Sequence, residues 1–256
     1  MENPSYITLS RQTVLRRQMD VLANNLANMS TPAFKAEALM VIEHESPIST
    51  QGPRGMRNVS FVKDLATVRD LSEGALVHTD NPLDVAISGD GYFAIETDDG
   101  ERYTRKGSFM LDGEGRLVTT AGQPVLDDRS RPIVVPPGSG EIEIAQDGTI
   151  PARDPLLPGQ NVVLGRFKVV AFENEYTLKR EANGLNRPGA GADPEPVAAP
   201  TVFQGMIEKS NVNGIVEMTR LIETVRNFQS ASKVVDDEHE RQRKAIETLT
   251  RSSLSA

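Results

Sequence analysis

The sequence LRRQMDVLANNLANM at residues 15–29 decides much of the fold, because its apolar residues recur at alternating spacings of four and three. This spacing places five side chains along one side of a helix: Leu15, Met19, Leu22, Leu26 and Met29. A seam this narrow requires a partner helix to cover it. We therefore predict a helix over about residues 4–30, which Pro32 brings to an end.

A second stretch with the same spacing lies near the other end of the chain. Its seam consists of Met218, Leu221, Val225, Phe228, Val235, Ile246 and Leu249, with Ser232, His239 and Gln242 as polar interruptions. Either Asn211 or Asn213 suits the N-cap position. A helix from there to about residue 250 would be roughly 54 Å long, and without a partner it would expose its seam.

Three asparagines cluster in the last turns of the first helix: Asn24, Asn25 and Asn28. One interpretation is that weak helix formers collect where a helix frays. The other is that their amides form hydrogen bonds across a helix interface and fix its register, as buried asparagines do in coiled coils. The sequence does not decide between the two.

The middle of the chain has the pattern of short antiparallel strands. Residues 33–42 fit helix or strand equally, and residues 43–60 read as a loop or flexible arm. From about residue 61 to 180, alternating apolar runs are separated by Asp-Gly pairs, which favour tight hairpin turns. These runs predict an all-β body of the sandwich or barrel-like kind.

The predicted fold class is therefore α+β, with long, coiled-coil-like helices at both termini and a central all-β domain. We divide the chain into a helical assembly segment at 1–42, a flexible arm at 43–60, a β domain at 61–210 and a second helical assembly segment at 211–256. The predicted assembly interface comprises the two seams from Leu15 to Met29 and from Met218 to Val235, with the three asparagines as candidates for fixing the register.

The composition excludes several classes of function. The net charge of −8 and the lack of clustered basic residues argue against a nucleic-acid partner. No apolar run approaches the length of a membrane span, so membrane insertion is not expected. The absence of cysteine excludes disulfides, thiolate metal sites and a cysteine nucleophile.

No motif predicts catalysis, a metal site or a cofactor. The three histidines, His44, His78 and His239, are dispersed and do not have metal-ligand spacing. The Ser88–Gly91 stretch lacks the first glycine of a nucleophile elbow. The aspartate-rich turns lack the spaced ligands of an EF-hand. We expect no enzyme activity, no metal and no cofactor.

Three separate segments resemble the bacterial flagellar rod and hook proteins. They are VLANNLANMSTPAFKAE at residues 21–37, the block from LSEGALVHTDNPLDVAISGDGYFAI onward at residues 71–126, and SNVNGIVEMTRLIETVRNFQSASKVV at residues 210–235. The chain length and the central block fit the rod proteins rather than the hook subunit. Within the rod group the proximal rod branch is most similar, and the distal branch is the alternative.

The chain departs from the family pattern at two positions. Ala33 stands where the family usually has glycine, so a turn with positive φ there would be strained or shifted. Gly214 stands where the family often has proline, which weakens the first turn of the last helix but leaves the Asn213 cap available.

The resemblance implies a structural role in a bacterial flagellum. It implies export through the flagellar type III apparatus without a cleaved signal peptide, and Met1–Ser10 lacks the features of such a signal. It also implies stacking with other rod proteins into a hollow shaft that crosses the periplasm in the basal body. Head-to-tail contacts that do not close produce such a filament. The competing hypothesis is a soluble β-domain adaptor that dimerises through its terminal helices.

Overall fold

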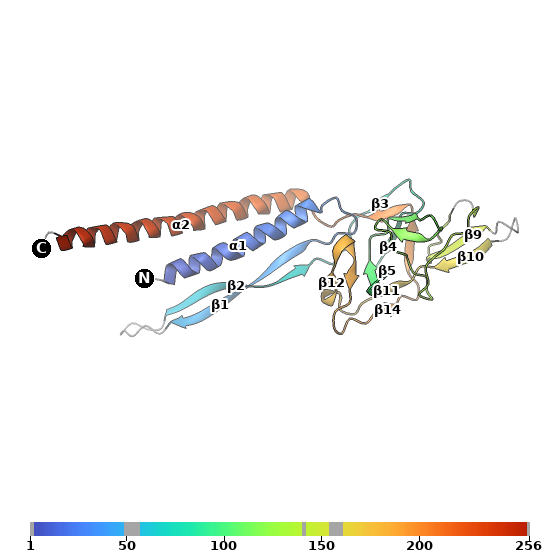
Figure 1. Cartoon of the computed structure of the whole chain (residues 1–256), viewed down its shortest axis with the longest axis horizontal. Coiled ribbons are helices and arrows are strands. Elements are labelled where there is room, and N and C mark those ends of the chain that lie inside the picture. The colour runs from blue at the N-terminus through green and yellow to red at the C-terminus, as the bar shows by residue number, and fades with distance from the viewer. Residues whose placement is uncertain (1–2, 49–56, 140–141, 154–160, 255–256) are drawn as a thin grey trace. The chain divides into compact units, whose positions relative to one another are not determined.

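The chain folds as two units, each built from segments that are far apart in the sequence (Figure 1). The computed structural model describes residues 3–48, 57–139, 142–153 and 161–254. Unit 1 comprises Met1–Asn28, Glu37–Asp70 and Val212–Ala256, and unit 2 comprises Met29–Ala36 and Leu71–Asn211.

Two helices pack side by side in unit 1. Helix α1 (Asn3–Ala27) contains 25 residues and helix α2 (Gly214–Leu254) contains 41. The Gln12 side chain bonds to Ser232, and the Asn25 side chain bonds to Glu217. Because a later residue of α1 meets an earlier residue of α2, the helices are antiparallel, as Figure 1 shows. The two terminal helices thus pair within one subunit.

The helices do flank a β-rich region, and the fold is broadly α+β, but the prediction of coiled-coil-like helices is wrong. The three most buried positions of α2 are Glu217, Thr224 and Ala231, which alternate with the partly buried Leu221 and Phe228. Polar and small residues at every second seam position cannot supply the apolar knobs that a coiled coil requires. Helix α1 also packs against two β-strands, so its surface is not reserved for a partner helix.

Those strands are β1 (Glu37–Ile48) and β2 (Arg57–Arg69), which form an antiparallel pair with an irregularity between Met40 and Val41. The undecided stretch at residues 33–42 thus becomes strand from Glu37 onward. The predicted arm differs as well, since residues 43–48 and 57–60 lie in paired strands. Residues 49–56 of that arm lie outside the described part of the chain. Packing against α1 stabilises this two-stranded ribbon, because an isolated pair of strands is only marginally stable in water.

Unit 2 consists of one six-stranded sheet and several two-stranded pairs. The large sheet has the order β12-β13-β6-β5-β11-β14, and the pairs are β15-β4, β16-β3, β7-β8 and β10-β9. The bounds of these strands are β3 Leu76–His78, β4 Val85–Ser88, β5 Tyr92–Thr97, β6 Gly100–Thr104, β7 Phe109–Leu111, β8 Leu117–Thr119, β9 Thr149–Arg153, β10 Asn161–Arg166, β11 Val169–Ala171, β12 Lys179–Arg180, β13 Asn186–Arg187, β14 Glu195–Pro196, β15 Thr201–Gln204 and β16 Met206–Glu208. Two short 3₁₀ helices occupy Glu175–Thr177 and Ala182–Gly184.

An aromatic cluster forms the centre of the unit 2 core. The ring of Phe93 lies edge-on to Phe109 at 5.2 Å and to Phe167 at 5.3 Å between centroids. Each of these side chains is at most 3% exposed. Aliphatic residues from β4, β5, β11 and β15 pack around them. This core makes unit 2 a body with its own apolar interior.

The Asp-Gly turns are only partly as predicted. Asp98 and Asp99 connect the paired strands β5 and β6, and the turn that begins at Asp112 connects the paired strands β7 and β8. In contrast, the Asp90–Gly91 turn is not a hairpin, because it leads from β4 to β5 and these strands pair with other partners. An Asp-Gly pair therefore predicts the turn but not the pairing of its neighbours.

Ala33 adopts the strained conformation, one of the two outcomes that the resemblance to the family implies. Its φ is 57°, in the left-handed region that favours glycine. Its backbone N–H nevertheless donates to the Glu208 carbonyl at 2.8 Å. The turn is thus kept in place in spite of the side chain rather than shifted.

We predict that Ala33→Gly stabilises unit 2. Relief of the left-handed strain, offset in part by the greater freedom of glycine in the unfolded chain, should add about 0.5–1 kcal/mol. The measurement is the chemical denaturation midpoint followed by tyrosine fluorescence. Ala36→Gly in the same segment, where φ is not positive, is the control and should lower the midpoint. Equal effects of the two substitutions would contradict the assignment of strain to Ala33.

Candidate assembly interface

The predicted seam of α1 is largely covered within the subunit. Leu15 and Leu22 are buried, and Met19 and Leu26 are partly buried. Met29 is the exception, because it is 48% exposed and belongs to unit 2. Most of this seam therefore stabilises the fold of unit 1 itself.

The predicted seam of α2 divides between two faces of the helix. Leu221, Phe228 and Val235 are partly buried, on the face that also carries the buried Glu217, Thr224 and Ala231. Met218 lies elsewhere and is 51% exposed. Val225, one residue beyond Thr224, is partly buried. The face that packs inside the subunit thus differs from the predicted seam at every second position, where the buried residue lies one position earlier in the sequence: Glu217, Thr224 and Ala231 replace Met218, Val225 and Ser232.

A second apolar stripe lies on the outer side of α2. Ile215, Met218 and Ile222 follow one another at spacings of three and four, so they share one face of the helix. Their exposed fractions are 82%, 51% and 49%. A helix with apolar residues on two faces requires two partners, and α1 supplies only one of them.

The ribbon adds further apolar surface to unit 1. The residues Met40, Val41 and Ile42 of β1 are each more than 40% exposed. The same unit exposes Leu9 of α1 and Val216, Val234 and Ile246 of α2. Exposed apolar patches of this kind mark interaction surfaces in soluble proteins.

The three candidate asparagines have different environments. Asn25 is 1% exposed, and its amide bonds to both the N–H and the C=O of Glu37 and to the Glu217 carboxylate, at 2.8–2.9 Å. Asn24 and Asn28 bond to each other at the end of α1. Asn25 thus holds the start of β1 and the start of α2 against α1, whereas the other two cap a helix end.

The cap of α2 is Asn213. Its side-chain oxygen accepts from the backbone N–H groups of Ile215 and Val216, which satisfies donors that a helix leaves open at its first turn. The Glu217 carboxylate, held by Asn25, also accepts from Arg220 at 2.9 Å. The beginning of α2 is therefore fixed by both backbone and side-chain contacts.

A buried ionic network organises unit 2. The Glu208 carboxylate, on a residue 3% exposed, accepts from Arg105 at 2.8 Å, from Lys35 at 2.6 Å and from the Gly74 N–H at 3.0 Å. Arg105 also donates to the carbonyls of Gly89 and Gly91. Burial by itself raises the pKa of Glu208, but the charge of Arg105 and the bonds from Lys35 and Gly74 outweigh it and lower the pKa.

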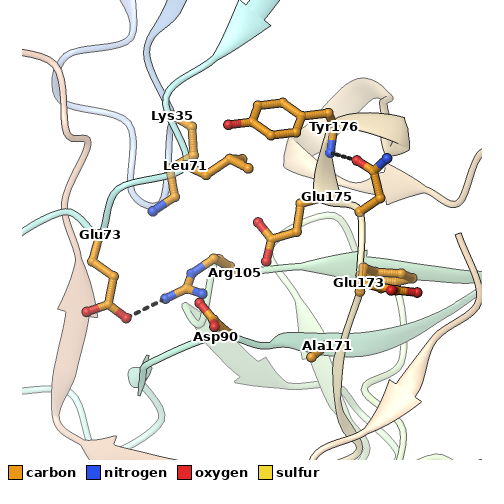
Figure 2. Close-up of a pocket in the computed structure, with 11 residues that line it drawn as sticks. Lys35, Leu71, Glu73, Asp90, Arg105, Ala171, Glu173, Glu175 and Tyr176 are labelled. Atoms are coloured by element: carbon orange, nitrogen blue, oxygen red, sulfur yellow. Dashed lines mark hydrogen bonds and ion pairs between the residues drawn. The ribbon is translucent and has the colours of Figure 1, made fainter.

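A cavity of about 300 Å³ adjoins this network (Figure 2). Figure 2 shows Glu73 bonded to Arg105 at one side, with Glu175 and Asp90 nearby and the exposed Tyr176 across from them. The Glu175 carboxylate accepts from the Tyr92 hydroxyl. The cavity contains neither a nucleophile paired with a base nor a histidine, so its geometry offers no catalytic constellation.

In the described ranges, no group of three or more His, Cys, Asp or Glu side chains is arranged to hold a metal ion. No helix in that part of the chain has the length and apolarity of a membrane span.

Sequence reasoning missed several of the residues that organise the two units. Ile215 and Ile222 could have been found, because with Met218 they follow the same spacing as the predicted seam. Glu217 and Glu208 gave no local signal, since a charged residue in a helix or strand is normally solvated. Their partners Asn25 and Arg105 are 192 and 103 residues away.

We predict that Asn25→Ala destabilises unit 1, whereas Asn24→Ala does not. Removal of the buried amide takes one hydrogen-bond partner from the Glu37 backbone groups and from the Glu217 carboxylate, at a cost of about 2–3 kcal/mol. Thermal unfolding followed by far-ultraviolet circular dichroism measures this loss. The exposed Asn24 is the matched control, and a comparable loss in both variants would contradict the assigned role of Asn25.

Acid should weaken unit 2 through Glu208. Because its pKa is lower in the folded state, the stabilisation is complete above the ordinary glutamate pKa of about 4.3 and is lost as the pH falls below that value. Glu208→Gln should destabilise unit 2 by about 3–5 kcal/mol at pH 7, because it removes the buried counter-charge of Arg105 and Lys35.

The difference between Glu208→Gln and the parent chain should shrink as the pH falls, as read from denaturation midpoints between neutral and acid pH. Glu73→Gln removes the other, half-exposed carboxylate that bonds to Arg105. It serves as the control and should cost less than about 1 kcal/mol. A pH-independent difference for Glu208→Gln would refute the linkage.

Three family models match separate parts of the chain. The model "Flagella basal body rod protein" matches residues 6–35, "Flagellar hook protein FlgE/F/G D1 domain" matches residues 86–152, and "Flagellar basal body rod FlgEFG protein C-terminal" matches residues 204–248. The first and last matches cover most of α1 and α2, and the middle match lies in unit 2.

Curated relatives match almost the whole chain. The flagellar basal-body rod protein FlgF of Caulobacter vibrioides is 38% identical over 251 residues, which cover 97% of this chain and 98% of that protein. FlgF of Escherichia coli is 34% identical over 265 residues, covering 98% and 100%. FlgG of Bacillus subtilis is 30% identical over 246 residues, covering 90% and 92%. The resemblance predicted from the sequence is thereby confirmed: the chain belongs to the family of flagellar basal-body rod proteins and is a FlgF-like member of it.

Proposed function

We propose that this structural rod subunit occupies the proximal part of the flagellar rod and polymerises there through unit 1. Copies of the chain and other rod proteins would stack helically into a hollow shaft that crosses the periplasm and transmits torque. The observation that carries the proposal is the outer stripe of α2, Ile215, Met218 and Ile222, which unit 1 leaves exposed.

The two faces of α2 suggest two separate roles for this helix. The inner face, with Leu221 and Phe228, packs within the subunit, so it stabilises unit 1 before any partner arrives. The outer stripe is then the surface left for a neighbouring helix. Burial of three such side chains would contribute about 1.5–3 kcal/mol each, and many such contacts in series would give a stiff shaft.

The same division weighs against a dimerising adaptor. That hypothesis needs the seams of both terminal helices for a second molecule, but the helices pair with each other inside one chain. We also propose that the chain is not an enzyme. This rests on its membership of a structural protein family and on the absence of a catalytic constellation around the described cavity.

We further propose that the flagellar export apparatus delivers the subunit, as the resemblance implies. Export through a narrow channel requires an unfolded chain, and the absence of cysteine means that no disulfide could lock the fold beforehand. The subunit would then fold and pair its helices at the growing end of the rod.

A separation of function tests the proposal. Met218→Asp combined with Ile222→Asp should abolish rod assembly and swimming in a strain that lacks the native gene, because two charges would enter the contact between subunits. The isolated variant should keep its circular dichroism spectrum, since both side chains are exposed in the subunit. Met218→Leu with Ile222→Val is the matched control and should swim normally.

Leu221→Asp combined with Phe228→Asp should give a different defect. Swimming should again be lost, but the isolated protein should also lose helical signal while unit 2 stays folded, because these side chains lie on the face toward α1. Normal swimming of the Met218 and Ile222 aspartate variant would refute the outer stripe as the assembly surface.

A further inference from the structure

Residues 29–36, here called the anchor segment, lie between α1 and β1 in sequence but belong to unit 2. Both of their neighbouring elements belong to unit 1. A connection of this kind would ordinarily be a linker, with few contacts of its own. The second half of the anchor segment, residues 33–36, is instead bound to the rest of unit 2.

Phe34 is the apolar part of this attachment. It is 2% exposed, one of the largest fully buried side chains in the described chain, and the Arg180 guanidinium lies over its ring at 4.3 Å from the centroid. A buried ring under a cation combines apolar burial with a cation–π contact. The Phe34 side chain is thus held in a buried position within unit 2.

The polar contacts of the anchor segment reach the other places at which the chain enters or leaves unit 2. Lys35 donates to the Glu208 carboxylate and to the Ser72 carbonyl, at 2.6 and 2.7 Å. The Ala36 N–H donates to the Asn211 side chain at 2.7 Å. The same Asn211 amide donates to the Ser72 carbonyl at 3.0 Å. The entry at residues 29–36, the entry near residue 72 and the exit at residue 211 are therefore tied to one another.

This arrangement matters because α1 and α2 are separated by 186 residues in the sequence. The entropy lost on bringing two segments together grows with the length of chain between them. Once the anchor segment is seated, however, α1 ends two residues before Met29, and α2 begins three residues after Asn211. The remaining connection between the helices is then short.

We propose that the anchor segment is a permanent part of unit 2 that holds the bases of α1 and α2 together, so that the helices pair as neighbours after the subunit reaches the rod. The assembly step rests on the proposed function, but the seating of the segment does not. Unit 2 with its anchor would fold first and act as the template for unit 1.

Hydrogen exchange measured by mass spectrometry on the full chain tests the seating. The Leu221→Asp and Phe228→Asp double variant is used, because its helices lack their packing face and should exchange freely. Amides of residues 33–36 should stay protected to the same degree as those of β5 and β6. Protection that disappears together with that of α1 would overturn the proposal.

The contacts themselves are tested by Lys35→Met combined with Asn211→Ala, in the parent chain and in the helix variant. Amides of the anchor segment should exchange about tenfold faster or more, because the substitutions remove the hydrogen bonds that tie the segment to Glu208, Ser72 and Asn211. The amides of β5 should change by a smaller factor, because Gly74 and Arg105 still donate to Glu208. Unchanged protection of the anchor segment would show that these contacts do not hold it, and would also overturn the proposal.

The swimming assay separates this inference from the proposed function. If the Lys35 and Asn211 variant loosens the anchor but assembles rods as efficiently as the parent chain, the anchor does not serve helix pairing, and the inference fails while the rod function stands. The expected result is loss of swimming together with a folded β core. Lys35→Arg, which keeps the charge opposite Glu208, is the matched control and should swim.

Discussion

The buried carboxylate of Glu208 is the constraint on which unit 2 depends. A carboxylate at this depth costs several kcal/mol unless donors surround it. Its donors come from three separate stretches of chain: Lys35 from the anchor segment, Gly74 from the stretch before β3, and Arg105 from the residue after β6. The carboxylate is therefore satisfied only when all three stretches are in place. This requirement couples the three stretches to one another in the polar centre of unit 2.

Unit 1 is organised in a similar way by a buried polar group, but this group is an uncharged amide. Asn25 joins the end of α1, the start of β1 and the start of α2 through one buried amide. A polar group in such a position adds less stability than an apolar one, but it tolerates only one register of its neighbours. The inner seam of α2 is otherwise permissive, because Thr224 and Ala231 would pack in more than one register. Asn25 and Glu217 select one of them.

Much of the fold could be predicted from the sequence, and the failures have physical causes. Both helices follow from local rules of spacing and capping, with Asn213 as one of the two cap candidates, whereas the turn at Ala33 was indicated by the glycine that the family usually has there. The face of α2 that packs inside the subunit could not be predicted in this way, because Leu221, Phe228 and Val235 fit two heptad patterns equally well. A buried partner at Glu217 decided between the patterns, and no local rule predicts a buried glutamate. The β1–β2 ribbon was not predicted for a related reason. Its strands contain charged residues and Pro47, and it is the contact with α1 that stabilises them.

The difference in length between the helices bears on how the subunit can polymerise. At 1.5 Å per residue, α2 is about 60 Å long and α1 about 38 Å. The antiparallel register set by Gln12 and Ser232 brings the start of α1 opposite the region of residue 241, so the last turns of α2 extend beyond it. Ile246, on that extension, is 61% exposed. The apolar stripe at the beginning of α2 and this extension lie at opposite ends of one helix. If the stripe of one subunit contacts the extension of the next, the pair keeps one free surface of each kind, and further subunits can add head to tail.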